Sequence, residues 1–109
     1  MADFTVPPTT LAVAPTAPQS SACSGTMMTV QGMPTGGSGM YTHSWSAAPN
    51  PLSPAGVTFD DPTLENPKAT FTGSLVGIDY TFTLTYTATD AVTGCTETGT
   101  VDVFVLRYL

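Results

Sequence analysis

Positive charge is almost missing from this sequence. Of its 109 residues only two are Lys or Arg, against eight Asp or Glu, so the formal net charge is −6. Such a chain repels phosphate backbones, which excludes nucleic acid as a partner. Histidine occurs once and cysteine twice. A zinc site of His and Cys ligands therefore cannot be assembled without carboxylates in unfavourable positions.

Long apolar runs and catalytic motifs are also absent. No apolar run approaches the roughly 20 residues that a membrane-spanning helix needs, and no basic segment precedes an apolar one near the start. We therefore expect no membrane insertion. The sequence contains no Gly-x-Ser-x-Gly motif and no Gly-rich phosphate loop. We expect that the chain is not an enzyme and that it needs no cofactor, apart from the calcium ion considered below.

Threonine dominates what is present. It fills 21 of the 109 positions, whereas the helix formers Glu, Lys, Arg and Gln are scarce. A β-branched side chain fits the pleated surface of a strand and loses rotamer freedom in a helix. The length suits one domain with a core of its own. The composition therefore predicts a single all-β domain.

Alternation of apolar and polar residues marks the expected strands. The clearest run is 80–89, which places Tyr80, Phe82 and Leu84 on one face, toward the core, and threonines on the other. Shorter runs predict further strands at 26–30, 41–46, 57–59, 69–71 and 101–105. Six or seven short strands with frequent turns are typical of a β-sandwich.

The first 22 residues differ in composition from the rest. They hold four prolines among Thr, Ala and Ser, which is typical of a semi-extended linker. Their apolar residues Phe4, Val6, Leu11 and Val13 are able to supply one edge strand. We therefore divide the chain into a Pro/Thr-rich linker that donates an edge strand, residues 1–22, and a β-sandwich, residues 23–109.

Five segments, taken in order, resemble PKD-like domains of the immunoglobulin-like superfamily. They are residues 43–45 (HSW), 59–62 (FDDP), 66–71 (NPKATF), 77–84 (GIDYTFTL) and 89–90 (TD), within a span of about 23–106. In that family an aromatic-x-Trp strand, a Gly-x-Tyr strand entry and a closing Asp recur in this order. The matching residues here are His43 and Trp45, Gly77 and Tyr80, and Asp90, with one extra residue between Gly77 and Tyr80. An acidic, Gly-rich turn often follows the Trp in that family, and its role is not carried over because residues 46–49 read SAAP.

The resemblance implies an immunoglobulin-like (PKD-like) antiparallel β-sandwich of about seven strands. Similar modules come from bacterial cell-surface or secreted multidomain proteins, where they act as non-catalytic spacers or adhesion elements in tandem arrays. It implies an extracellular or cell-surface location, with this chain as an excised fragment without its signal peptide. The expected partners are neighbouring domains of the same chain, together with surface polysaccharide or another protein. The resemblance also implies that Trp45 lies in the core and that Tyr80 occupies a tyrosine corner.

Cys23 and Cys95 form the one cysteine pair. An even count in a Lys-poor, Thr-rich chain favours an oxidising compartment and a disulfide. The strand order of an immunoglobulin-like sandwich opposes this pairing, because Cys23 and Cys95 then lie toward opposite ends. A disulfide between them therefore requires a shifted strand or a long first loop.

Two weaker candidate sites have competing interpretations. Tyr41, Trp45 and Tyr86 offer flat rings that could stack on sugars, which would make the chain a carbohydrate-binding module. The alternative is that a lone Trp on this strand belongs to the core. A second cluster, Asp60, Asp61 and Glu65, offers oxygen ligands for Ca²⁺, but two Asp residues before a proline are also typical turn formers.

Overall fold

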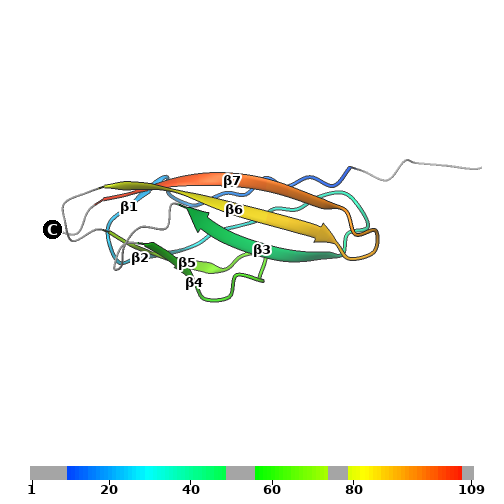
Figure 1. Cartoon of the computed structure of the whole chain (residues 1–109), viewed down its shortest axis with the longest axis horizontal. Coiled ribbons are helices and arrows are strands. Elements are labelled where there is room, and N and C mark those ends of the chain that lie inside the picture. The colour runs from blue at the N-terminus through cyan, green and yellow to red at the C-terminus, as the bar shows by residue number, and fades with distance from the viewer. Residues whose placement is uncertain (1–9, 49–55, 74–78, 107–109) are drawn as a thin grey trace, which may run out of the picture.

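The computed structural model describes residues 10–48, 56–73 and 79–106, which form seven strands (Figure 1). The described residues contain no helix, so the prediction of an all-β chain with about seven strands is confirmed. The strands are β1 (Ser21–Ala22), β2 (Thr26–Thr29), β3 (Tyr41–Ala48), β4 (Gly56–Phe59), β5 (Lys68–Thr72), β6 (Tyr80–Asp90) and β7 (Thr96–Val105).

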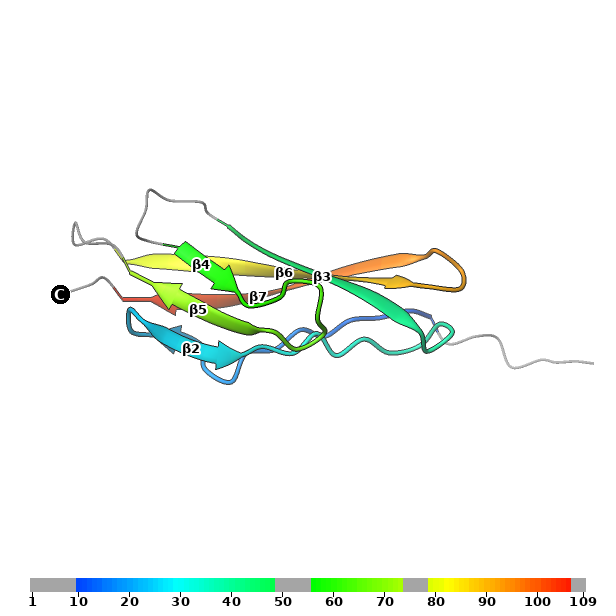
Figure 2. The ribbon, with the colours of Figure 1, turned by 90° about the horizontal axis from the view of Figure 1, so that it is seen from below.

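The strands form two sheets. One sheet has the order β1-β7-β6-β3, and the other has the order β2-β5-β4. All neighbours are antiparallel except β1 and β7, which run parallel. Figures 1 and 2 show the three-stranded sheet lying across one face of the longer sheet. Buried apolar side chains from both sheets form a single cluster between them, as in a β-sandwich.

The longest strand, β6, occupies the centre of the larger sheet. Its burial alternates strictly from Phe82 to Asp90, because every second side chain points toward the other sheet. Trp45, Phe82 and Leu84, which the sequence places in the core, are buried, and Tyr80 is half-buried against the same cluster. The core residues are Ala22, Met28, Val30, Trp45, Ala69, Phe71, Phe82, Leu84, Tyr86, Ala88, Val103 and Val105.

The outer face of the larger sheet is covered with hydroxyl groups. The register places Thr42 of β3 beside Thr89 of β6, and Thr89 beside Thr96 of β7. Equivalent rows follow along the strands, and the Thr87 and Thr98 hydroxyls lie 3.0 Å apart. Threonine is favourable at such half-exposed strand positions. The alternation therefore assigns the apolar side chains to the core and the threonines to solvent.

Strand β7 begins earlier than the sequence predicts. Apolar alternation indicated a strand over 101–105, but β7 starts at Thr96. The early positions on the inward side of β7 hold Glu97, which is exposed, and Gly99, which packs against Val13 and Pro15, and neither residue gave a hydrophobic signal. Backbone pairing with β6 continues along this stretch regardless of the side chains. The long hairpin of β6 and β7 is therefore the largest pairing in the domain.

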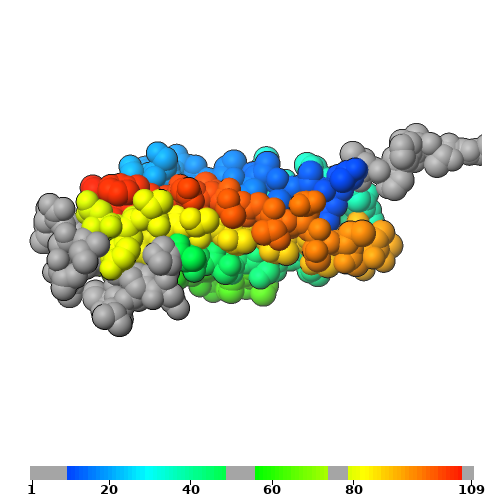
Figure 3. All heavy atoms as spheres, turned by 45° about the horizontal axis from the view of Figure 1, so that its top comes forward, coloured from blue at the N-terminus to red at the C-terminus, as the bar shows by residue number. Residues whose placement is uncertain are grey.

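The described part of the first 22 residues runs alongside β7. Ala12 and Thr16 form isolated bridges with Thr35 and Gln31. Ser21 and Ala22 then pair with the end of β7 as an edge strand. Figure 3 shows this segment, in blue, along the orange and red surface of β7. Of the apolar residues expected to form the edge strand, Leu11 and Val13 are not in a strand, and Phe4 and Val6 lie outside the described residues.

Gly99 allows the segment to pack closely. A Cβ atom at this position would lie 2.7 Å from Cδ of Pro15 and 2.9 Å from Cγ2 of Val13. Val13 is one of the half-buried residues that contact the core. Residues 10–22 thus contribute both a strand and apolar contacts to the sandwich.

Gly32 plays a similar part beside a fully buried aromatic ring. A Cβ atom at Gly32 would overlap the ring of Tyr86, which has no exposed surface. We expect Gly32→Ala to lower the free energy of unfolding by roughly 1–3 kcal/mol, the usual cost of overpacking a core. Chemical denaturation measures the change, with Gln31→Ala, at an exposed neighbouring position, as the control. Equal stability of the two variants would show that the Tyr86 ring does not occupy this space.

Candidate functional site

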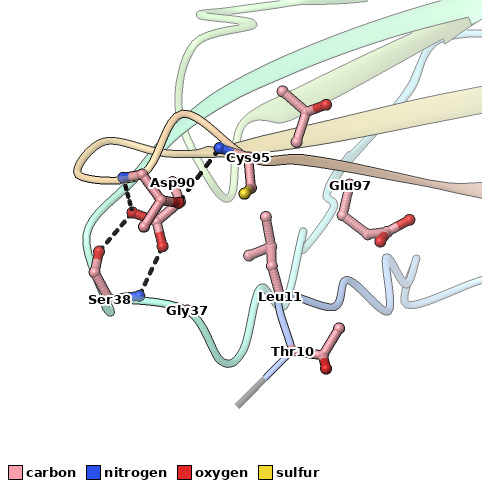
Figure 4. Close-up of a pocket in the computed structure, with 9 residues that line it drawn as sticks. Thr10, Leu11, Gly37, Ser38, Asp90, Cys95 and Glu97 are labelled. Carbon is pink, nitrogen blue, oxygen red and sulfur yellow. Dashed lines mark hydrogen bonds between the residues drawn. The ribbon is translucent and has the colours of Figure 1, made fainter. Parts of the chain in front are cut away.

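Asp90 is the most heavily hydrogen-bonded side chain described. It is the last residue of β6, points inward, and is only 1% exposed. Its Oδ2 accepts the Ser38 N–H at 2.7 Å, and its Oδ1 accepts the Ser38 hydroxyl at 2.7 Å (Figure 4). Oδ1 also accepts the backbone N–H groups of Val92 and Thr93. Asp90 therefore ties the β6–β7 turn to the Gly-rich loop of residues 36–39.

The loop fits the carboxylate because it carries glycine where a side chain would collide. A Cβ atom at Gly37 would overlap the Asp90 carboxylate, and the φ of Gly37 is +59°. The hydrogen bonds from Ser38 hold the pKa of Asp90 well below its usual range. Beside this network lies a pocket of about 440 Å³. Its lining includes Leu11, Cys95 and Glu97 (Figure 4).

Protonation of Asp90 is expected to destabilise the domain. Its pKa is lower in the folded chain than the ordinary Asp value of 3.8. The stabilisation is therefore complete above pH 4 or so and declines as the pH falls through 3.8 toward the folded pKa. We expect Asp90→Asn to unfold at lower temperature than the wild type at pH 7, because an amide cannot accept at both oxygen positions.

Thermal unfolding between pH 7 and pH 2, followed by circular dichroism, tests this. The difference in unfolding temperature between the wild type and Asp90→Asn should become smaller as the pH falls. Asp102→Asn is the control, because the exposed Asp102 carboxylate lies on the outer face of β7, away from the loops that Asp90 joins, and accepts from the Thr83 hydroxyl. A gap that stays constant down to pH 2 would contradict the assignment.

The aromatic candidates Trp45 and Tyr86 lie in tilted ring contact inside the sandwich. The rings of Trp45 and Tyr86 lie 5.0 Å apart, and His43 stacks on Tyr86 at 5.8 Å. The Trp45 Nε1–H donates to the Glu65 carbonyl, and His43 Nδ1 lies 2.5 Å from the Tyr86 hydroxyl. Burial, helped by the nearby Glu65 carboxylate, raises the pKa of Tyr86 to about 12, so this hydroxyl stays protonated.

This burial agrees with the core interpretation of Trp45 and gives no support to a sugar-stacking platform. Trp45 is 4% exposed and Tyr86 is fully buried, so neither ring can contact a ligand from solvent. Tyr41 is half-buried, and its hydroxyl donates to the Gly36 carbonyl at 2.6 Å. Stacking on a sugar requires an accessible ring face. In the described residues these rings hold β3 against the core instead of forming a platform.

The fluorescence of Trp45, the only Trp of the chain, tests this placement. We expect a blue-shifted emission maximum that does not change with soluble polysaccharides or with Ca²⁺, because the indole is shielded from water. Unfolding in guanidinium should shift the emission to the red and serves as the internal control. A red-shifted native spectrum that moves with one glycan would show an accessible Trp45.

The acidic loop is a set of turns. Asp60 Oδ1 accepts the backbone N–H groups of Asp61 and Lys68, at 2.7 and 2.9 Å. Asp61 Oδ1 accepts both the N–H and the hydroxyl of Thr63, which lowers the pKa of Asp61. Across residues 10–48, 56–73 and 79–106, no three His, Cys, Asp or Glu side chains gather as a metal site would require. Asp60 and Asp61 thus act as turn formers, and they do not gather with Glu65 as a set of three ligands.

The two cysteines do not pair. Both are free and exposed. Cys23 follows β1 next to the end of β7, whereas Cys95 immediately precedes the start of β7. The length of the strand separates them, so the predicted disulfide within one chain is wrong. The physical reason is the strand order, which places Cys23 and Cys95 at opposite ends of β7.

The role of Asp90 was missed by sequence reasoning. Asp90 was matched only as the residue that closes a strand, without its partner Ser38. An Asp ahead of a short turn, combined with a distant Gly-Gly-Ser-Gly loop, was the available signal. The tyrosine corner at Tyr80 stays a prediction, because residues 74–78, which include Gly77, lie outside the described residues.

The comparisons with known proteins give no relative. No family model, no curated protein and no solved structure matches this chain. Within the described ranges there is also no helix long and apolar enough to cross a membrane.

Proposed function

We propose that this chain is a non-catalytic, PKD-like module of the immunoglobulin-like class, acting as a spacer or adhesion element in a bacterial cell-surface or secreted protein. The strand order supports the class. With β2, β4 and β5 taken as strands B, D and E, and β3, β6 and β7 as strands C, F and G, the two sheets have immunoglobulin neighbours. The buried Trp45 on β3 agrees with a core Trp on strand C.

One observation carries the spacer role: the described chain enters and leaves at opposite ends of the sandwich. Thr10 and Leu11 line the pocket beside Asp90 and Cys95, at the β6–β7 turn. Leu106 donates its N–H to the Ala22 carbonyl at the far end of β7. A module with this arrangement can be joined in a row, and its own length adds to the distance spanned.

The first and last strands also suit a module that carries tension. Residues 10–20 lead from the β6–β7 turn to β1, and β1 pairs with the end of β7 in parallel. Opposite forces at residues 10 and 106 slide these strands past each other. Because inter-strand hydrogen bonds run across the strands, such sliding loads them together and not one after another. The spacer then resists extension.

The proposed partners are the neighbouring domains of the same chain, with surface polysaccharide or another protein for an adhesion role. An extracellular location is part of the same proposal, and it agrees with the acidic, Thr-rich composition. The buried rings described above give no support to the carbohydrate-binding alternative. The spacer role is therefore the one that the geometry favours.

Single-molecule force measurement tests the spacer role. With handles at residues 10 and 106, we expect a higher unfolding force than with handles at residues 10 and 93, which lie at the same end. Leu106→Pro removes the N–H that bonds Ala22 and should lower the force in the first geometry. Leu106→Ala keeps this N–H and is the matched control. Equal forces in the two geometries would overturn the proposal.

A further inference from the structure

The pocket beside Asp90 is large enough for a small molecule. Its volume of about 440 Å³ lies within the range of known small-ligand sites. It is bordered by the start of the described chain, by the Gly-rich loop of residues 36–39 and by the β6–β7 turn with the strand ends beside it. Figure 4 shows the Cys95 sulfur directed toward Leu11, and these two residues give the lining an apolar part.

Two acidic residues, Asp90 and Glu97, also line the pocket. Glu97 lies opposite Ala88 in the β6–β7 register, and the Asp90 N–H donates to the Cys95 carbonyl. Asp90 and Glu97 are therefore diagonal neighbours across the two strands, with backbones about 7–8 Å apart. In Figure 4 the side chains of Leu11 and Cys95 lie between those of Asp90 and Glu97. The pocket thus has a carboxylate on either side of an apolar middle.

Neither carboxylate is paired with a positive charge in the described part of the chain. The donors to Asp90 are neutral groups of Ser38 and of the β6–β7 turn. Glu97 has no hydrogen bond or ion pair with any described residue, and Lys68, the only Lys or Arg among these residues, lies in the other sheet. Asp90 is 1% exposed, so water screens its charge weakly. The pocket therefore attracts cations.

The arrangement of these charges indicates the shape of the ligand. A metal ion needs oxygen ligands that converge on one point, whereas Leu11 and Cys95 separate the two carboxylates. We propose that the pocket binds a small linear diammonium ion, the protonated form of an aliphatic diamine. One ammonium group contacts Glu97, the other lies beside Asp90, and the methylene groups between them contact Leu11 and Cys95. Asp90 Oδ2 accepts one hydrogen bond from the described residues and can accept a second. This inference goes beyond the spacer role and does not depend on it.

An NMR titration of the ¹⁵N-labelled chain with 1,4-diaminobutane at constant ionic strength tests the proposal. We expect amide shifts confined to the segments that line the pocket, residues 10–11, 37–38 and 93–97. n-Butylamine has the same carbon chain but one charge. Its affinity should be roughly tenfold lower, because it makes no contact with the second carboxylate. Magnesium chloride, which carries two charges on one ion, should not shift these segments.

Glu97→Gln and Asp102→Asn are a matched pair of variants. Each removes one exposed carboxylate from β7, but Asp102 lies on the outer face and accepts from the Thr83 hydroxyl. We expect Glu97→Gln to lower the affinity for 1,4-diaminobutane to about that for n-butylamine, and Asp102→Asn to change it by less than about twofold. Three results would overturn the proposal: no shifts in the pocket segments, equal affinities for the two amines, or equal losses in the two variants. The force measurement uses no ligand, so the spacer role is judged separately.

Discussion

The structure depends on the period-two alternation of β6. This strand lies between β3 and β7, and its inward side chains form the middle of the core. A shift of one residue in its register would turn Phe82, Leu84 and Tyr86 to solvent and bury threonines instead. The pairing of both neighbours is thereby fixed. The inward side chains of β6 form an apolar surface, and side chains of the second sheet, including Met28 and Phe71, pack against it.

The same alternation explains why a carboxylate is buried. Asp90 occupies the next inward position after Ala88, at the point where the strand ends and no apolar partner remains. N–H and O–H groups from two loops donate hydrogen bonds to the Asp90 carboxylate. These hydrogen bonds hold both loops in place. Asp90 therefore marks the end of the core. Its hydrogen bonds also shape the β6–β7 turn and hold the residues that border the pocket. Cys95 takes its place from this arrangement, since its carbonyl accepts the Asp90 N–H.

Particular residues show which features of the fold and of the site can be predicted from the sequence. The alternation at 80–89 and the shorter runs contain enough information for an all-β chain with about seven strands, because burial follows directly from period two. The start of β7 was not predictable in this way, since Glu97 and Gly99 pair through backbone alone. The partner of Asp90 is 52 residues away in sequence, and no local pattern identifies it. Whether Tyr86 is exposed depends on what covers it, here including the backbone at Gly32.

The hydroxyl rows on the outer face of the larger sheet have a consequence for the environment in which the module works. Across β3, β6 and the paired part of β7 this face presents mostly Thr and Ser, together with Ala48, Phe104 and the single carboxylate of Asp102. Dissolved salt weakens attractions and repulsions between exposed charges, but it has little to act on here. Neighbouring molecules that pass this face therefore meet the same surface in fresh water and in brine, and its behaviour is set by hydration of neutral groups.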